Sequence, residues 1–369
     1  APLPPAVPEV EPDPVDAALL SPAAFVSGTE VLVPSGAKAR VQANIAALKL
    51  LAALREAARP ATRDEQRILA GWSGWGAVPE VFDRRSDRFS TERAELADLL
   101  TRDEYQRAEA SILNAHYTDP AVAQVMWEAL IDAGFSGGRV LEPGCGSGTF
   151  IGHAPVSAVM VGVEVDPITA GIASALYPSA QIRNEGFEQT RVPEASFAAT
   201  MGNVPFGRYV VHDPAYNPTG QHSIHNAFIL KSLALTAPGG FVAVLTSRWT
   251  LDAVSDKARS EMADRAELIT ALRLPSQAFS RVAGTEAVTD LLVLRRRTEP
   301  RSAEDKPIWL QSTPVEIGED RVDINAYFQA NPDNVLGRTG LGHGLYGSAN
   351  LVVTGLSGQE LAAQMRDRL

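Results

Sequence analysis

The chain has 369 residues, of which 45% are apolar and 21% charged, and its mean hydropathy is −0.05. This length and composition are those of a globular protein with a sizeable buried core, in one large or two modest domains. The formal charge of −11 argues against a surface that binds polyanions everywhere, and the single cysteine, Cys145, excludes an internal disulfide framework and a zinc site built on several cysteines.

Residues 1–37 are predicted to form a flexible arm, because the first 25 or so are rich in proline. This start has neither the basic residues nor the apolar core of a signal peptide, and no stretch of the chain reaches membrane-spanning length. We therefore expect a cytoplasmic protein without a membrane partner.

Residues 38–115 are predicted to form an N-terminal helical region. Apolar residues recur at helical spacing at Val41, Ile45, Leu48 and Leu51, and Pro60 ends that run. The pairs Thr62–Glu65 and Thr101–Glu104 are typical of capping boxes that open further helices. Between them lies the glycine-dense loop GWSGWGAVPEVFD, in which Trp72 and Trp75 either fill a gap in the core or form a wall beside a ligand.

Seven short apolar runs follow, separated by helix-length segments and mostly ended by Gly, Asn or Asp. They are GRVLEP, AVMVGVEVD, AQIRNEGF, SFAATMGN, GGFVAVLTS, LITALRL and AVTDLLVLRR. This alternation predicts a doubly wound α/β sheet over residues 116–298, with ligands at the carboxyl ends of the strands. The polar segment TEPRSAEDKP then predicts a link to a small C-terminal extension, residues 299–369.

The end of the first predicted strand is a candidate cofactor site. Three glycines at alternate positions let the backbone turn sharply and approach a ligand closely, and the helix that follows offers free N–H groups. A dinucleotide loop needs G-x-G-x-x-G, whereas G-x-G-x-G behind an acid is the pattern for S-adenosylmethionine. The candidate cofactor residues here are Glu142, Pro143, Gly144, Cys145, Gly146, Gly148, Thr149 and Phe150.

The second predicted strand ends in Glu164, Val165 and Asp166, followed by Pro167. An acid at this place can accept both ribose hydroxyls of the cofactor, and Glu164 is the better candidate because it directly follows the apolar run. Asp166 is predicted to cap the next helix, because Pro167 then takes the first helical position.

Upstream, Asp119 and Pro120 predict a helix start, and His116, Tyr117 and Thr118 precede it. These three residues either close over the methionine end of the cofactor or serve only as a cap and its packing.

The stretch Gly202–Gly207, GNVPFG, leaves the fourth predicted strand beside the cofactor loop. The lone pair of an exocyclic amine is delocalised into its ring, so the nitrogen is a poor nucleophile. The side-chain carbonyl of Asn203 and the main-chain carbonyl of Val204 can both accept from such an amine and aim it at a sulfonium methyl. Pro205 stiffens the loop, and the ring of Phe206 can stack on a base that has left its duplex.

With these motifs the chain resembles the N6-adenine DNA methyltransferases, whose catalytic motif is Asn-Pro-Pro-Tyr or Asn-Pro-Pro-Phe. It is most similar to the methyltransferase portion of large phage and plasmid proteins of the anti-restriction type, which join such a domain to a helicase. The resemblance runs through GWSGWGAVPEVF, LNAHYTDP, LEPGCGSGTFIG, GVEVDPITA, GNVPFG, IHNAFILKSL, PGGFVAVLTSRWTLD, ALRLPSQAF and TEAVTDLLVL, and INAYFQANPDNVLG extends it into the C-terminal segment.

The resemblance implies a Rossmann-like class I S-adenosylmethionine-dependent methyltransferase fold, a doubly wound, mostly parallel sheet of seven strands. It also implies that Tyr117, Thr118, the glycine loop, Glu164 and the Gly186–Phe187 region hold S-adenosylmethionine. Asn203 to Phe206 would then hold a flipped adenine of DNA, for direct methyl transfer without a covalent intermediate, and Cys145 is not a nucleophile.

The chain departs from the family pattern at two places. Val204 replaces the first proline, but a residue before Pro205 is biased to extended geometry, so its carbonyl can keep a similar direction. Many relatives also place an aspartate on the cofactor's adenine amine after the third strand, where this chain offers Glu185 or Glu188. No large target-recognition domain follows residue 298 and no helicase motif is present. We therefore expect that sequence choice is loose, or is supplied by another part of a longer protein or by a partner. The resemblance also implies a helicase domain or subunit as a partner.

Other readings of the sequence stay open. In the first, the chain is a methyltransferase whose acceptor is an RNA base or a protein glutamine amide. In the second, it is a non-catalytic scaffold that binds cofactor or DNA within a defence or anti-restriction assembly. A nicotinamide oxidoreductase is disfavoured by the glycine spacing. No metal site is expected, because His222 and His225 have no cysteine or carboxylate pair near them in the sequence, and His225 instead opens a helix or borders the substrate cleft.

Overall fold

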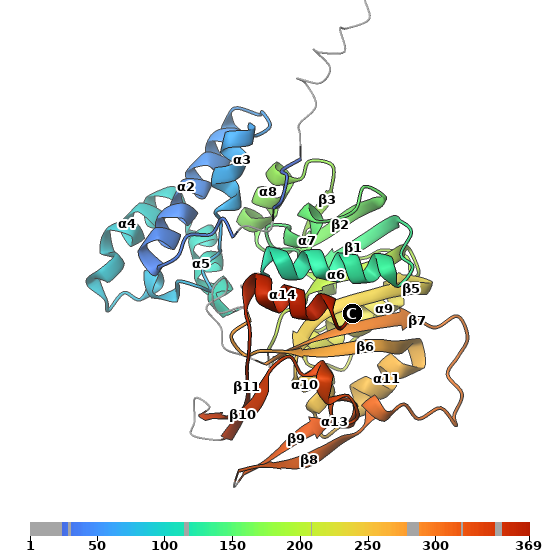
Figure 1. Cartoon of the computed structure of the whole chain (residues 1–369). Coiled ribbons are helices and arrows are strands. Elements are labelled where there is room, and N and C mark those ends of the chain that lie inside the picture. Colours follow the sequence, from blue (N-terminus) through green and yellow to red (C-terminus); the bar gives the residue numbers. More distant parts are fainter. Residues whose placement is uncertain are drawn as a thin grey trace, which may run out of the picture.

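The computed structural model describes residues 24–28, 31–113, 118–207, 209–278, 288–318, 320–343 and 349–369. A seven-stranded sheet with helices on both faces forms its centre, and a helical N-terminal region lies to one side of this sheet (Figure 1). His116 and Tyr117, two of the predicted cofactor residues, lie outside the described residues. In the part of the chain that the structure describes, no helix has the length and apolar character needed to cross a membrane.

The seven strands coincide with the seven apolar runs predicted from the sequence. They are β1 (Gly138–Pro143), β2 (Ala158–Glu164), β3 (Gln181–Asn184), β4 (Phe197–Asn203), β5 (Thr236–Ser247), β6 (Ala266–Leu274) and β7 (Thr289–Arg296). Their order across the sheet is β3-β2-β1-β4-β5-β7-β6, and only β7 runs antiparallel to its neighbours. The expected Rossmann-like, doubly wound and mostly parallel sheet is confirmed.

The sheet is buried on both faces, which is why its central strands are continuously apolar rather than alternating. Val140 of β1 and Met160 of β2 belong to one apolar cluster, whereas their neighbours Leu141 and Val161 belong to a second one. Helices α6 (Pro120–Asp132), α8 (Pro167–Leu176) and α14 (Gly358–Arg366) contribute to the first cluster. Helices α9 (Ile224–Leu235) and α11 (Lys257–Arg265) contribute to the second.

The N-terminal region contains α2 (Ala37–Glu56), α3 (Arg63–Ala70), α4 (Ser90–Leu99) and α5 (Arg102–Ala110), with short 3-10 turns η1 (Pro79–Phe82), η2 (Asp87–Phe89) and η3 (Ser111–Leu113). Both capping boxes predicted from the sequence are present, at Thr62–Glu65 and at Thr101–Glu104. Helices α2 and α3 pack on α8, so this region is attached to the sheet through one of its crossover helices.

The C-terminal segment, residues 299–369, packs back on the sheet and its helices. It contains η5 (Ile308–Leu310), a hairpin of β8 (Ser312–Ile317) and β9 (Asp320–Asn325), α13 (Ala326–Ala330), η6 (Pro332–Asn334), a hairpin of β10 (Arg338–His343) and β11 (Ala349–Thr354), and α14. Helix α14 lies along α6 (Figure 1), and Leu361 and Met365 are buried in the first apolar cluster. Arg366 of α14 also pairs with Glu128 of α6 at 2.7 Å.

A buried ion network joins this segment to the ends of β5, β6 and β7. Arg273 donates to both carboxylate oxygens of Asp290 at 2.8 Å and to Asp252 at 2.9 Å. Asp252, in the short helix α10 (Trp249–Asp252), also accepts from Arg248 at 3.0 Å and from the backbone amide of Asn325 at 2.9 Å. Two arginines balance two aspartates here, so the charges that the fold buries are compensated.

Candidate active site

The glycine loop between β1 and α7 (Thr149–Gly152) takes the conformation that its spacing requires. Gly144, Gly146 and Gly148 have φ of 71°, 54° and 89°, in the left-handed region that side chains other than glycine rarely adopt. The amides of Gly144 and Cys145 donate to the carbonyl of Val163 in β2, at 2.8 and 2.9 Å. The loop is therefore fixed to the neighbouring strand and turned toward the space above both strand ends.

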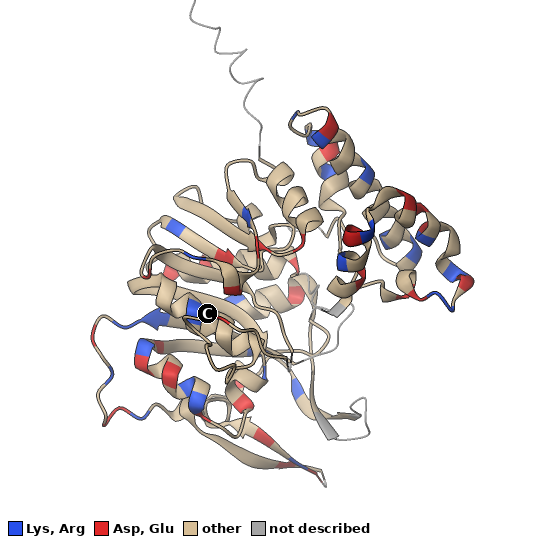
Figure 2. Ribbon diagram, turned by 180° about the vertical axis from the view of Figure 1, so that it is seen from behind, with Lys and Arg blue, Asp and Glu red and all other residues tan. Residues whose placement is uncertain are grey.

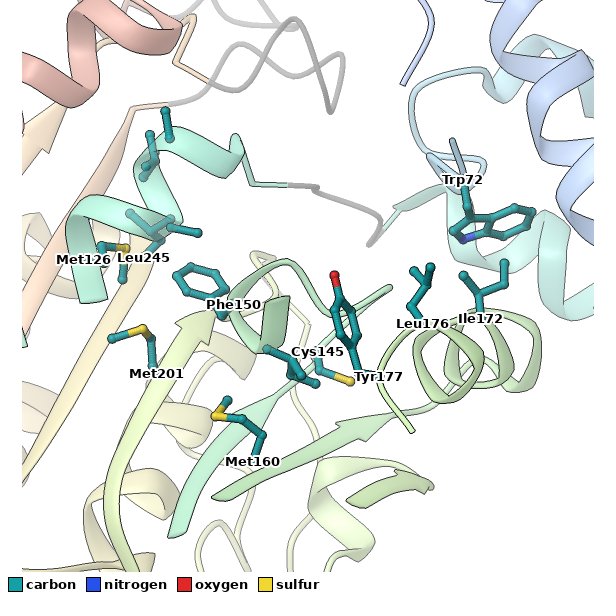
Figure 3. Packing of buried hydrophobic residues seen from close by; sticks show 14 of the residues in the cluster. Trp72, Met126, Cys145, Phe150, Met160, Ile172, Leu176, Tyr177, Met201 and Leu245 are labelled. Carbon is teal, nitrogen blue, oxygen red and sulfur yellow. The ribbon is translucent and has the colours of Figure 1, made fainter. Parts of the chain in front are cut away.

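Packing below the loop leaves no room for a larger residue at Gly148. A Cβ atom there would lie 2.7 Å from the ring of Tyr177, whose hydroxyl lies 2.9 Å from Ser27 Oγ. Figure 3 shows Cys145, Phe150 and Tyr177 among the apolar side chains of this core. Burial raises the pKa of the Cys145 thiol well above its ordinary value, so this thiol is protonated and serves as packing.

The two acids that follow β2 have separate roles. Glu164 accepts from the backbone amide of Gly146 at 3.0 Å and from that of Asp166 at 2.8 Å, so its carboxylate faces the glycine loop. Burial raises the pKa of Glu164 to about 7. Asp166 accepts from the amide and hydroxyl of Thr169 and precedes Pro167, the first residue of α8. The predicted capping role of Asp166 is confirmed.

Glu142, near the end of β1, is a second buried acid at the same place. Its side chain is 2% exposed, and burial raises its pKa well above the ordinary value although the amides of Ile151 and Phe150 donate to it. Its Oε2 atom has no hydrogen-bond partner among the described residues. A buried carboxyl oxygen without a partner is costly, and it is the kind of group that a bound ligand's donor can satisfy.

The GNVPFG stretch leaves β4 beside the glycine loop, as predicted. Asn203 is the last residue of β4, and Val204 extends the pairing with β5 by donating to Leu245 O at 3.0 Å. Pro205 then lies against the loop, with its Cδ 3.9 Å from the position of a Cβ on Gly144. The Nδ2 of Asn203 donates to Thr118 Oγ1 at 3.2 Å.

One cavity of about 280 Å³ brings these elements together. The predicted site residues that line it are Thr118, Glu142, Gly144, Cys145, Gly146, Thr149, Phe150, Glu164, Val165, Asp166, Gly186, Phe187, Asn203, Val204 and Pro205. Pro143, Gly148 and Phe206 are described but are not part of its wall. Pro143 ends strand β1, Gly148 packs on Tyr177, and Phe206, within the GNVPFG stretch, is half-buried.

The cavity wall also contains residues that the sequence analysis did not assign to it. They are Gly74, Ser111, Val163, Thr169, Tyr209, Val211, Ile224 and Phe228. Trp72, for which two roles were open, has both: it is 1% exposed, lines the cavity and donates from Nε1 to Thr169 Oγ1 at 3.2 Å. The density of glycines around Trp72 was the only sequence signal for this wall.

The wall at the end of β3 is held by a buried lysine on α9. Lys231 Nζ donates to the carbonyls of Phe187 and Thr190, at 2.5 and 3.0 Å, and to Asp213 Oδ2 at 2.7 Å. The ring of Phe187 packs against that of Phe228, with ring centroids 4.9 Å apart. Lys231 thus connects the Gly186–Phe187 region with the chain that follows the GNVPFG stretch.

Two glutamates were left open for the missing aspartate, and both line the cavity. Glu185 accepts from Arg183 Nε at 2.7 Å. The carboxylate of Glu188 lies over Gly186, where a Cβ would meet its Oε1. Because Glu185 is already paired with an arginine, Glu188 is the better candidate for contact with a ligand's amine.

His225 is the second residue of α9, which agrees with the expectation that it opens this helix. Its Nε2 lies 2.9 Å from Ser223 Oγ, and burial lowers the pKa of His225 to about 4, so the ring is neutral near pH 7. Within the described ranges, no group of three or more His, Cys, Asp and Glu side chains is placed to hold a metal ion.

No protein-family model matches the chain. It is 28% identical over 278 residues to Defense against restriction protein B of Escherichia phage P1, an alignment that covers 74% of this chain and 11% of that protein. The chain therefore spans about a tenth of the length of this curated relative.

Two solved structures share the general arrangement. One, of a candidate class I S-adenosylmethionine-dependent methyltransferase from Listeria monocytogenes, is 15% identical with a TM-score of 0.43, covering 73% of this chain and 90% of the other. The second is a modification subunit of a candidate type I restriction enzyme from Vibrio vulnificus, 17% identical with a TM-score of 0.41, covering 72% of this chain and 64% of that subunit.

Proposed function

We propose that this chain is an S-adenosylmethionine-dependent methyltransferase that transfers a methyl group to N6 of an adenine flipped out of DNA. The observation that carries the proposal is the shared cavity: the Asn203–Pro205 stretch and the glycine loop both line it, and Pro205 Cδ lies 3.9 Å from the position that a Cβ on Gly144 would take. Direct transfer needs a donor site next to an acceptor site, and the common cavity supports this assignment of the two stretches.

The residues of the cavity fit S-adenosylmethionine. Its ribose hydroxyls can donate to the carboxylate of Glu164, which already faces the glycine loop. Its ammonium can satisfy the partnerless Oε2 of Glu142, and its adenine fits beside Phe187 with its amine near Glu188. The left-handed glycines leave the space that side chains would otherwise fill. When bound, this cofactor supplies an electrophilic methyl group on sulfur.

The chain's own residues would prepare the acceptor. The Oδ1 of Asn203 and the carbonyl of Val204 would accept from the amine of adenine, localise its lone pair and direct it toward the glycine loop. Pro205 limits the motion of these acceptors, and Phe206 and Tyr209 offer rings for stacking. Held in this way, the amine nitrogen would take the methyl group from the sulfonium sulfur and would lose its proton to water.

DNA is favoured as the acceptor because the chain is similar to a phage protein named for defence against restriction. A helicase domain or subunit as a partner stays a prediction that rests on the family resemblance alone. An RNA base or a protein glutamine amide would need the same two hydrogen-bond acceptors, Asn203 Oδ1 and the Val204 carbonyl. An experiment must therefore distinguish these substrates from DNA.

The test is incubation of the purified chain with methyl-labelled S-adenosylmethionine and DNA, RNA or protein, followed by digestion and identification of the modified atom. We expect N6-methyladenine from DNA. Label in RNA or on a glutamine amide would change the substrate. Binding of S-adenosylmethionine without transfer to any acceptor would favour the non-catalytic scaffold.

A further inference from the structure

A second hollow lies in the N-terminal region, away from the candidate active site. It has a volume of about 780 Å³ and lies between α4, α5 and the loop that precedes η2. We call it the α4–α5 groove. Its charged and aromatic lining consists of Arg84, Arg93, Arg102, Tyr105 and Glu109. Three arginines against one glutamate make it positive within a chain of net charge −11.

None of the three groove arginines forms an ion pair with a described carboxylate, although the charge of Arg93 contributes to the lowered pKa of nearby Asp83. Arg93 donates to two backbone carbonyls, those of Val81 and Ser86, so neutral acceptors hold its guanidinium in place. Arg84 and Arg102 are exposed, and neither forms an ion pair with any described carboxylate. By contrast, Arg85 pairs with Asp83 at 3.1 Å and Arg107 pairs with Asp103 at 3.6 Å, on the same loop and helix.

Two of the groove arginines, Arg84 and Arg93, act electrostatically on the same side chain, that of Tyr105. Tyr105 lines the groove, and the charges of Arg84 and Arg93 both act on its phenol, although burial and Glu109 keep its pKa above the ordinary value. Guanidinium groups that surround an open space and lack carboxylate partners are suited to bind phosphate oxygens through paired N–H donors.

A rigid series of aromatic rings connects the groove with the candidate active site. Tyr105 packs edge-on against Phe82 at 5.4 Å between centroids, Phe82 against Trp75 at 5.5 Å, and Trp75 against Trp72 at 5.5 Å. Trp72 lines the active-site cavity. Helix α5, on the side of the N-terminal region nearest the sheet (Figure 1), also leads directly to Ser111 of the cavity wall.

We propose that the α4–α5 groove binds the phosphate backbone of the DNA duplex that carries the target adenine. The inference rests on the proposed function, because it takes DNA as the substrate. Acidic and basic residues are mixed over the ribbon, the N-terminal region included (Figure 2), and a net negative chain repels DNA unless a local positive site orients it. Contacts to phosphate fix position on the duplex and leave the reading of bases to other residues.

The test compares two charge-matched double variants. Arg84→Gln with Arg102→Gln removes two charges from the groove. Arg85→Gln with Arg107→Gln removes two charges from the same loop and helix outside the groove. All four side chains are exposed, so both variants should fold as the parent chain does. Binding to a fluorescent DNA duplex is measured by anisotropy from 50 to 200 mM salt, without cofactor.

We expect the groove variant to bind DNA about tenfold more weakly at low salt. Its slope of log affinity against log salt should be shallower by about 2, because about 0.9 counterions are released per phosphate contact. The control variant should bind within about twofold of the parent. Equal binding by both variants, or an unchanged slope in the groove variant, would overturn the proposal.

The outcome is separable from that of the proposed function. Arginine-dependent DNA binding by a chain that transfers no methyl group would support the groove and contradict the enzyme. If the parent chain binds no DNA duplex but binds single-stranded RNA or an acidic peptide through Arg84 and Arg102, the groove has a different partner and the inference is wrong. Calorimetry with S-adenosylmethionine should give the same affinity for all three proteins.

Discussion

Asn203 at the end of β4 donates from Nδ2 to Thr118 Oγ1 at 3.2 Å, so the residue that precedes the α6 cap holds the amide of the GNVPFG stretch. With Nδ2 directed at Thr118, the Oδ1 of Asn203 points away from Thr118. An acceptor whose direction is set by a second element needs little reorganisation when a substrate amine arrives. Thr118 is therefore a positioning residue in the proposed reaction.

Asn203→Ala should lower kcat by at least about a hundredfold while the Kd for S-adenosylmethionine changes less than about threefold. The reason is that, in the proposed function, this amide holds the acceptor, whereas other residues hold the cofactor. Labelled-methyl transfer and calorimetry measure the two quantities. Thr118→Val is the matched variant: it keeps the shape and loses the acceptor oxygen, and should cost about tenfold in kcat. Equal losses of transfer and cofactor binding in Asn203→Ala would show that this residue belongs to the cofactor site.

Cofactor affinity should rise with pH between about 6 and 8 and then level off. The pKa of Glu164 is raised to about 7, so below that pH the side chain is largely protonated in the free protein. The ribose hydroxyls donate to the ionised carboxylate, so below this pKa binding must release a proton from Glu164. The cofactor affinity should therefore rise by up to about tenfold per pH unit. Because the folded pKa lies above the unfolded one, ionisation of Glu164 also makes the ligand-free fold less stable as pH rises from about 4.5 through 7.

Glu164→Gln is the control for this pH dependence. It should weaken binding and make the calorimetric Kd nearly independent of pH over the same range. A Glu164→Gln variant that keeps the parent's pH dependence would assign the titration to another acid of the site, for which Glu142 is the first candidate.

Local signals in the sequence were enough to predict the framework of the site. Asp119–Pro120 and Asp166–Pro167 each pair a capping side chain with the residue that best tolerates the first helical position, and both helices start there. The strand ends at Glu142, Glu164 and Asn203 follow from apolar runs stopped by polar residues. Parallel strands place these ends at one edge, so the sequence could bring the three residues together.

The remaining wall depends on contacts between residues distant in sequence. Phe228 reaches the cavity from the middle of α9, and Trp72 reaches it from the N-terminal region by its bond to Thr169. At neither position does the local sequence distinguish a residue that lines a ligand cavity from one that only packs in the core. The packing of α14 on α6 is likewise set by surfaces far apart in the chain, and no local pattern in the sequence predicted it.

Gly148→Ala should destabilise the fold and weaken cofactor binding, whereas Gly36→Ala should destabilise the fold and leave cofactor binding unchanged. Both glycines have φ of 89°, so alanine is strained at each by about 1–2 kcal/mol. A Cβ at Gly36 has open space, but at Gly148 it meets the ring of Tyr177 at 2.7 Å. Overpacking adds about 1–3 kcal/mol and displaces the loop.

Urea unfolding and calorimetry with S-adenosylmethionine measure the two effects at Gly148 and Gly36. Gly148→Ala should cost less stability in a Tyr177→Leu background than in the parent chain, because the smaller side chain removes the clash, and a double-mutant cycle measures this difference. If Gly148→Ala bound cofactor as the parent does, the geometry of this loop would not matter for binding.

Lys231→Met should lower the free energy of unfolding by about 3–5 kcal/mol, because it leaves the buried Asp213 carboxylate without its cation. Lys231 and Asp213 are both 2% exposed and lie 2.7 Å apart. Burial alone would raise the pKa of Asp213, yet the hydrogen bond from Lys231 holds it below the ordinary value. Asp213 therefore stabilises the fold above its unfolded pKa, and this contribution is lost as pH falls through the lower folded pKa.

Lys231→Met combined with Asp213→Asn tests the cause. The double variant removes both charges and keeps the oxygen that accepts from the amides of Ala215 and Tyr216, so it should be more stable than Lys231→Met alone. Urea unfolding at pH 7 and pH 4 measures the difference, which should shrink at pH 4 as Asp213 of the single variant becomes protonated. Equal stability of the single and double variants at pH 7 would mean that Lys231 acts through its bonds to the Phe187 and Thr190 carbonyls, and not through its charge.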